Sequence, residues 1–339
     1  MLTRLAILRL LEDSTTPPEM KAWLRASTPD APSLAEIERY FHSDRIGIFP
    51  RATDGLAYWA VVPDLIVMSD RPDNKADGYD VGERMLHFID LEFFHADESL
   101  RVYSHDLKGL PALAEVPNDR TDPRYLRSGM LPFRVADCFT RLVGQFRAGR
   151  LNDKPGQFPR DEHATKWAGM LAHYAQDNTQ PQHATLDYKS TSYFAEARKA
   201  PNVHSQLEYM MVDDDLNDHA DLRKEYWEAF AEALRTTQDG IATDDPWQST
   251  VEVARSSYTA LPLIGSAAMH ASGQGGTPQK PEGASGEFDL TKFFHFQGVR
   301  DGQAVTVLQM KAHQQALAVT RTVRLWRAAW DQAQRPSEN

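Results

Sequence analysis

The sequence is poor in cysteine, in long apolar runs and in positive charge, and each shortage excludes a class of site or protein. Cys138 is the only cysteine among 339 residues, so neither an internal disulfide nor a metal site built from cysteine thiolates is available. No stretch reaches the roughly 20 consecutive apolar residues that a membrane-spanning helix requires, so we expect no stable membrane insertion. The 37 lysines and arginines are outnumbered by 48 aspartates and glutamates, giving a net charge of -11. That balance argues against broad electrostatic capture of nucleic acid but leaves a local site open.

What the chain does contain is the composition of a globular protein, with 41% hydrophobic and 25% charged residues. Apolar residues recur with helical spacing, which predicts an all-α fold in a single domain over residues 1–339. The expected helices are one beginning almost at residue 1 and ending before Pro17, then 33–41, 132–149, 160–177, 202–211, 222–235 and 301–332. Residues 50–84 are expected to be irregular, and residues 272–287 to form a flexible loop. Weak strand signals lie at 57–62 and 304–308.

Several conspicuous residues have a structural interpretation. Ser33 and Glu36 have the spacing of a capping box at the start of a helix. Cys138 lies in an amphipathic helix and is expected to be a buried, unreactive thiol. Trp326 and Trp330, four residues apart, are expected to pack in the core rather than bind a ligand.

The most informative segment is HYAQDNTQPQHA, residues 173–184. His173 and Asp177 are four residues apart, so on a helix their side chains share one face and lie close enough for a metal ion to bridge them. Pro181 ends the helix, and His183 follows the break, where it can approach from another direction. Histidine and carboxylate together suit zinc.

Two further segments combine histidine with a carboxylate. His204 and Glu208 are again four apart on an expected helix, and the sequence LHFIDLE contains His87 and Asp90. An upstream stretch supplies more carboxylates, Asp64, Asp70, Asp73, Asp77 and Asp80. Each pair alone is more often a surface ion pair, and an acidic loop is usually just solvated. Three such segments in one chain predict a metal site.

These residues resemble a known superfamily, the zinc-dependent phospholipases C and the single-strand-specific zinc nucleases. Its central motif of His, three residues, Asp, then Gln-Pro and His lines up with residues 173–183. Its later His-Ser motif, with a carboxylate four residues after the His, lines up with residues 204–208, and its earlier His-Phe/Tyr-x-Asp motif with residues 87–90. The matched segments span about 60–210, and the region after about 240 adds nothing specific.

The resemblance implies an all-α fold and roles for individual residues. One zinc ion would be held by Asp64, His87, His173 and Asp177, with Asp64 preferred over Asp73 as the upstream ligand. A second would be held by the later ligands His183, His204 and Glu208. Asp64 and Asp90 would have catalytic roles, and a water activated by zinc would attack phosphorus.

The sequence departs from the family pattern at its N-terminus. The third zinc of the family is held partly by an N-terminal Trp and a nearby His, whereas here the first tryptophan is Trp23 and the first histidine is His42. Either a segment carrying those ligands is missing upstream, which the uncapped helix at the start favours, or the third zinc has been lost. We therefore expect two zinc ions, and a third only with an additional N-terminal segment. Gln176 and Gln182 are smaller departures.

The implied activity is hydrolysis of a phosphate ester, either in single-stranded nucleic acid or in a phospholipid head group. Glu208 and Ala184 favour the phospholipase branch, while the HFID segment and Asn202 favour the nuclease branch, so the substrate stays open. Candidate aromatic residues for stacking a base are Tyr58, Trp59, Phe93, Phe94 and Tyr188. The alternatives are a zinc-binding protein with little catalysis and a helical interaction protein whose His-carboxylate pairs are incidental. Family members are usually secreted or periplasmic, although this chain shows no signal peptide; oligomeric state is left open.

Overall fold

Helices dominate the computed structural model, which describes residues 1–28, 33–42, 55–68, 82–153, 162–195, 200–208, 219–273 and 288–336. Within those ranges no helix is both long and apolar enough to cross a membrane. The helices are α1 (Leu2–Glu12), α2 (Pro18–Ser27), α3 (Leu34–His42), α4 (Gly55–Trp59), α5 (Val62–Met68), α6 (Tyr125–Ser128), α7 (Leu131–Arg147), α8 (Ala164–Asp177), α9 (Val203–Glu208), α10 (Ala220–Thr236), α11 (Pro246–Tyr258), α12 (Leu261–Ala271), α13 (Leu290–His295) and α14 (Val307–Gln334).

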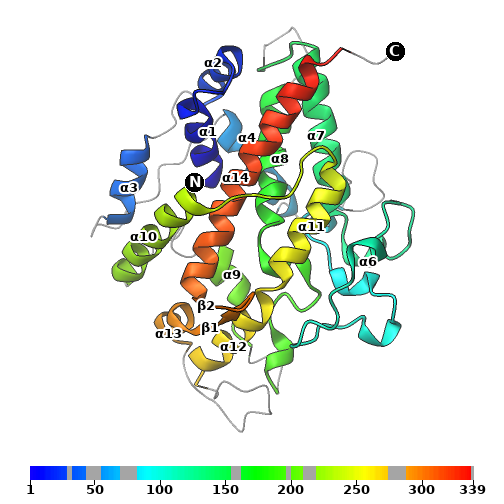
Figure 1. Ribbon diagram of the computed structural model, residues 1–339, viewed down its shortest axis with the longest axis vertical. Helices are drawn as coiled ribbons and strands as arrows, with labels where there is room; N and C mark the ends of the chain where they lie inside the picture. The colour runs from blue at the N-terminus through cyan, green and yellow to red at the C-terminus, as the bar shows by residue number, and fades with distance from the viewer. Residues whose placement is uncertain are drawn as a thin grey trace.

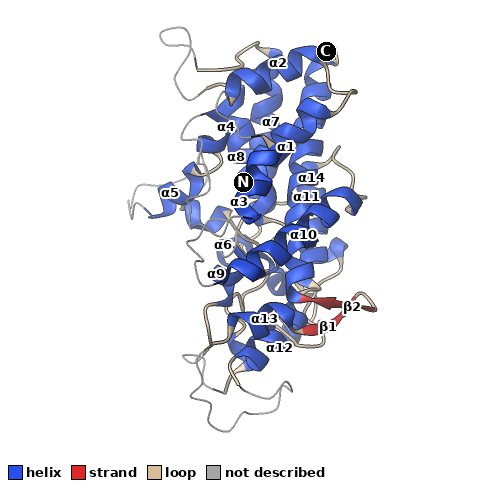
Figure 2. Cartoon of the chain, turned by 90° about the vertical axis from the view of Figure 1, so that its left-hand side faces the viewer, coloured by secondary structure: helices blue, strands red, loops and turns tan. Residues whose placement is uncertain are grey.

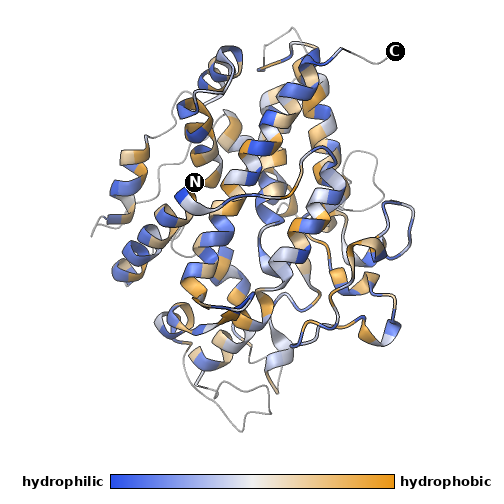
Figure 3. Ribbon diagram, in the orientation of Figure 1, coloured by the Kyte–Doolittle hydropathy of each residue, from blue (hydrophilic) through white to orange (hydrophobic). Residues whose placement is uncertain are grey.

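The longest helix, α14, runs through the middle of the molecule and contacts α1, α7, α8 and α10 (Figure 1). Thr306 caps its first turn, accepting a hydrogen bond from the backbone N–H of Gln309 at 3.1 Å. Hydrophobic and hydrophilic residues alternate along its ribbon (Figure 3). Its two tryptophans are buried as expected, and Trp326 donates from Nε1 to the carbonyl oxygen of Ala168 in α8 at 2.9 Å. These contacts fix α8, which carries the central motif, against the core.

One two-stranded antiparallel sheet is present in the described residues, formed by β1 (Gln297–Arg300) and β2 (Gln303–Thr306). The strands are joined by Asp301 and Gly302, with φ of 50° and 77°. Two consecutive residues with positive φ give the tight hairpin turn whose twist matches the strands. The hairpin lies at one side of the molecule, away from α5 and α9 (Figure 2).

Most predicted helices are observed. The helices expected at 2–16, 33–41, 132–149, 160–177, 202–211 and 222–235 correspond to α1, α3, α7, α8, α9 and α10 in their described parts. The capping box at the start of α3 is present, since the backbone N–H of Ser33 donates to Glu36 at 2.7 Å. Cys138 is buried in α7.

Some expectations were wrong. The strand signal at 57–62 was produced by residues that form the end of α4 and the start of α5, and these two helices also interrupt the stretch 50–84 that was expected to be irregular. The signal at 304–308 is correct as far as Thr306, and the last helix then begins at Val307 rather than 301. α2, α6, α11, α12 and α13 were not predicted. Most of the loop at 272–287 lies outside the described residues.

Candidate metal centre

A close contact between α4 and α8 brings the first group of side chains together. A Cβ atom at Gly169 would lie 2.5 Å from Trp59 Cβ and 2.7 Å from the carbonyl oxygen of Leu56, so only glycine permits this approach. α4 therefore packs directly on α8, and the short connection from α4 to α5 brings Ala60 and Asp64 beside His173.

Four predicted residues converge in the first cluster: Asp64, His87, His173 and Asp177. His87 Nδ1 and His173 Nε2 lie 3.1 Å apart, and Asp177 Oδ2 is 3.0 Å from the first and 3.2 Å from the second. Asp64 Oδ1 is 3.7 Å from His87 Nδ1 and 3.8 Å from His173 Nε2. Both imidazoles and Asp177 are buried, while the Asp64 side chain is 36% exposed. The cluster is thus reached from solvent on the Asp64 side.

The second cluster contains the other three predicted ligands, His183, His204 and Glu208. His204 Nε2 lies 2.8 Å from Glu208 and 3.3 Å from His183 Nε2. The rings of the two histidines are nearly parallel, with centroids 4.9 Å apart. His183 is buried in the turn after Pro181, whereas His204 and Glu208 are half-buried one turn apart on α9. The break after α8 therefore turns His183 toward a different helix, as its position in the sequence predicts.

Backbone carbonyl groups fix the tautomers of two histidines. His173 donates from Nδ1 to the carbonyl oxygen of Ala60 at 2.8 Å, and His183 donates from Nδ1 to the carbonyl oxygen of His87 at 2.7 Å. A carbonyl oxygen can only accept, so each Nδ1 bears a proton, and in the neutral ring each Nε2 directs a lone pair into its cluster. Such outer hydrogen bonds are typical of histidines that ligate metals. Sequence reasoning did not identify either acceptor.

The donor atoms within each cluster are separated by distances that suit ligands of one shared cation. Ligands at zinc distances of about 2.0–2.1 Å in a tetrahedron are separated by roughly 3.3 Å, close to the separations observed in both clusters. His183 Nδ1 bears a proton, so in the neutral ring its Nε2 lone pair faces His204 Nε2 at 3.3 Å, and a proton or a cation between these two nitrogens would satisfy the contact. His87 Nε2 and His204 Nδ1 are buried and have no hydrogen-bond partner in the described structure. Both clusters, as Asp64–His87–His173 and His183–His204–Glu208, have geometry that can hold a metal ion.

Electrostatics within the clusters follow from burial and close opposite charges. Burial opposes the His173 imidazolium, but the carboxylates of Asp177 and Asp64 outweigh it and raise its pKa to about 9. Burial also opposes ionisation of Asp177, yet His173 and His183 hold its pKa well below the ordinary value. For His183 burial prevails and lowers the pKa, which favours the neutral ring that a metal requires. Burial raises the pKa of Asp64.

Asp90, to which the resemblance gave a catalytic role, is not a member of either cluster. Its backbone N–H donates to the carbonyl oxygen of Ser128 at 2.6 Å. Burial, together with the nearby carboxylate of Glu92, raises the Asp90 pKa to about 8. Glu92 itself is fully buried and accepts hydrogen bonds from Thr185 and Tyr258. Of the acidic stretch, Asp70, Asp73, Asp77 and Asp80 lie outside the described residues.

Sequence reasoning missed Lys311, a buried residue of α14. Its Nζ donates to the carbonyl oxygens of Leu207 at 2.6 Å and Gln206 at 3.3 Å, in the last turn of the helix that carries His204 and Glu208. These two hydrogen bonds tie the helix that carries His204 and Glu208 to α14. No spacing rule connects residues so far apart in sequence.

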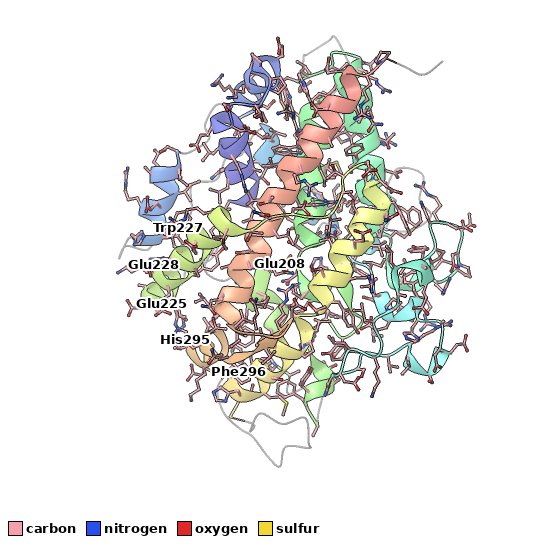
Figure 4. The ribbon with its side chains drawn as sticks, viewed as in Figure 1. Glu208, Glu225, Trp227, Glu228, His295 and Phe296 are labelled. Atoms are coloured by element: carbon pink, nitrogen blue, oxygen red, sulfur yellow. The ribbon has the colours of Figure 1, made fainter. Side chains whose placement is uncertain are left out.

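A further histidine–carboxylate pair shows what an isolated pair looks like in this protein. His295 Nε2 at the end of α13 lies 2.6 Å from Glu225 of α10, and both side chains are nearly half exposed (Figure 4). Neither belongs to the groups with metal-binding geometry found in the described ranges. The pair thus differs from the clusters in burial and in the number of converging donors.

Comparisons with protein-family models, curated proteins and solved structures found no match for this chain. The chemistry assigned to the protein therefore depends on the two clusters themselves.

Proposed function

We propose that this protein is a zinc-dependent phosphodiesterase of the helical type shared by the phospholipases C and the single-strand-specific nucleases. The observation that carries the proposal is the convergence of seven predicted side chains, six from three sequence motifs and Asp64 from the upstream acidic stretch, into two adjoining clusters. Six of the seven form the two groups with metal-binding geometry, and Asp177 contacts both histidines of the first. His183 connects them, because it belongs to the second cluster and donates to the backbone of His87 in the first.

Zinc is the cation that this donor set favours. The ligands are four histidines and three carboxylates, with no thiolate, and imidazole nitrogen with carboxylate oxygen is a common ligand set of catalytic zinc sites. Asp64, His87, His173 and Asp177 would hold one ion and His183, His204 and Glu208 the other. When bound, two neighbouring zinc ions supply Lewis acidity that polarises a phosphoryl oxygen and lowers the pKa of water.

The protein's own residues orient and protect this chemistry. Ala60 and the His87 carbonyl hold the imidazoles of His173 and His183 in one tautomer. The buried Asp177 stays ionised and offsets positive charge at the first cluster. The half-buried His204, Glu208 and Asp64 leave one side of the centre open to a substrate. Exposure on one side and burial on the other suit hydrolysis of a diester that approaches from solvent.

The test is zinc content and diesterase activity of the purified protein. We expect about two zinc ions per chain, and hydrolysis of bis(p-nitrophenyl) phosphate that a chelator abolishes and added zinc restores. A His173→Ala/His204→Ala variant should lose both. His295→Ala is the matched control, because it removes a histidine with a carboxylate partner outside the clusters.

Each outcome separates the alternatives left open by the sequence. Two zinc ions without turnover would favour a zinc-binding protein that lacks catalysis. Absence of zinc from the wild-type protein after equilibration with the metal would overturn the proposal and leave a helical interaction protein.

A further inference from the structure

A surface turn beside the second cluster presents an aromatic ring and a cation together. The segment between His183 and Ser190 exposes Tyr188, a residue that is 39% exposed, and Lys189 next to it. The Tyr188 ring stands perpendicular to the imidazole of His204, with centroids 5.9 Å apart. Tyr188 therefore lies at the edge of the second cluster, where a substrate bound there would extend.

The turn is held in one conformation by Asp187, which is buried. Its carboxylate accepts hydrogen bonds from the backbone N–H and hydroxyl of Thr191 at 2.7 and 2.6 Å, and from those of Ser192 at 3.1 and 2.6 Å. Ser190 has φ of 55°, a left-handed conformation that a non-glycine residue adopts at a cost. A contact surface that is ordered in advance loses less entropy when it binds a ligand.

Lys189 decides which kind of ligand suits this surface. Its Nζ lies 5.2 Å from the centre of the Tyr188 ring. Within the described part of the chain it has no carboxylate in ion-pair contact, so its charge is available to an anion. A quaternary ammonium head group, in contrast, would be repelled by the positive charge of Lys189 beside the same ring.

We propose that Tyr188 and Lys189 form a specificity site that selects single-stranded nucleic acid over choline phospholipid, with Tyr188 stacking against a base and Lys189 pairing with a phosphate. The proposal rests on the proposed phosphodiesterase function and names its substrate class. Single-strand binding proteins combine these same two elements, an aromatic platform and a cationic path for the backbone. The net charge of -11 does not oppose it, because charges beyond about 8–10 Å are largely screened at physiological salt.

The experiment compares zinc-loaded wild type with Tyr188→Ala, Lys189→Gln and the control Lys292→Gln, an exposed lysine of α13. Three substrates are used: a single-stranded oligodeoxynucleotide, soluble dihexanoyl phosphatidylcholine, and methyl p-nitrophenyl phosphate as a small diester. Binding of a labelled oligonucleotide is followed separately by fluorescence anisotropy over a range of salt concentrations. Binding is thereby measured independently of turnover.

We expect Tyr188→Ala to weaken oligonucleotide binding and lower kcat/KM by roughly 5- to 100-fold, the range for loss of one stacked base. Lys189→Gln should reduce the slope of log affinity against log salt by about 0.7, the value for one phosphate contact on a single strand. A turn that mattered only for folding would not change this slope. Both variants should lose more activity on the oligonucleotide than on the small diester, which carries no chain to lie along the turn, and Lys292→Gln should behave as wild type.

Two results would overturn the inference while leaving the phosphodiesterase proposal intact. One is unchanged oligonucleotide binding and salt dependence in both variants, with activity on the small diester retained. The other is preference of the wild type for the phosphatidylcholine, reduced by Tyr188→Ala, which would assign the site to a choline head group. Loss of small-diester hydrolysis in wild type itself would instead contradict the proposed function on which the inference rests.

Discussion

The Nδ1–H of His183 donates to the carbonyl oxygen of His87 at 2.7 Å, so a side chain of the second cluster is oriented by the backbone of the first. The two residues are 96 positions apart in sequence. The segment 87–89 and the turn 181–184 are further joined by the backbone N–H of Ile89, which donates to the carbonyl oxygen of His183 at 2.8 Å. These two hydrogen bonds couple the position of the first cluster to that of the second.

The first prediction is that the two metal ions bind with positive coupling. His173→Ala should abolish zinc binding at the first cluster and weaken the second about 10-fold, the lower end for loss of an outer hydrogen-bond partner, because the His87 segment is no longer held by a metal. Binding linkage is reciprocal, so His204→Ala should weaken the first ion by a similar factor. Competition with a zinc-binding dye measures both affinities. Equal affinities of the remaining site in wild type and variants would show that the clusters are independent.

A second prediction concerns Lys311 and the helix that carries His204 and Glu208. Lys311→Met removes the donor to two carbonyl groups in the last turn of α9 and leaves them buried without that partner. The free energy of unfolding should fall by about 1–3 kcal/mol. Zinc affinity of the second cluster should fall about 10-fold, as for other residues that orient a ligand.

Lys292, an exposed lysine, provides the control for the buried Lys311. Lys292→Met removes an exposed lysine on α13 and should change neither quantity appreciably. Lys311→Gln keeps a neutral donor and should recover part of the second-site affinity. A Lys311→Met protein that is destabilised yet binds the second zinc as tightly as wild type would show that Lys311 stabilises the core only.

The sequence predicted the parts of the centre that depend on local periodicity. His173 with Asp177, and His204 with Glu208, follow from the 3.6-residue period of a helix, and the separate approach of His183 follows from Pro181. That Asp64 and His87 join them was implied only by the resemblance, because no local pattern determines which distant segments meet. The contacts through Ala60 and Lys311 had no sequence signal at all, since one uses a backbone carbonyl and the other a lone lysine in a long helix.

Errors in the fold prediction have a similar origin. The run from Ala57 to Val62 contains aromatic and β-branched residues that favour strands in isolation, but packing against Gly169 of α8 makes helix the better conformation there. Local propensity was overridden by the tertiary contact between Trp59 and Gly169, residues far apart in the sequence. The same contact places the carbonyl oxygen of Ala60 beside His173 Nδ1. The segment whose conformation was wrongly predicted therefore also orients a histidine of the first cluster.

The third prediction uses Asp90, whose pKa of about 8 lies far above its ordinary value of 3.8. The folded protein keeps a proton that the unfolded chain releases, so the free energy of unfolding should decrease as pH rises from about 4 to about 8. Asp90→Asn removes this dependence. In metal-free protein at pH 9 the variant should be more stable than wild type by a few kcal/mol, on the order of 1.4 kcal/mol per pKa unit, while at pH 4 the two should be similar.

Urea unfolding at several pH values in the presence of a chelator measures this difference. Asp97→Asn is the matched control, because hydrogen bonds from Ser99 lower the Asp97 pKa and its titration lies below the range in question. Parallel pH profiles of wild type and Asp90→Asn between pH 4 and 8 would contradict the assignment of a raised pKa to Asp90.

The last prediction concerns a buried ion pair between Asp239, in the connection that follows α10, and Arg321 of α14. Asp239 has no exposed side-chain surface and lies 3.0 Å from Arg321 and 2.9 Å from Arg324. Arg321 also donates to the carbonyl oxygens of Ile241 at 3.0 Å and Ala242 at 3.3 Å, so it holds the whole connection toward α11. Arg321→Met leaves a buried carboxylate with one partner and two carbonyl groups with none from Arg321. We expect the free energy of unfolding to fall by about 3–5 kcal/mol, as when one partner of a buried pair is removed.

Arg321→Met combined with Asp239→Asn should be less destabilised than Arg321→Met alone, because the interior then contains no carboxylate that has lost its Arg321 partner. Urea denaturation with an unchanged m-value measures both effects. If the double variant is as unstable as the single one, the loss comes from the carbonyl contacts rather than from the charge of Asp239.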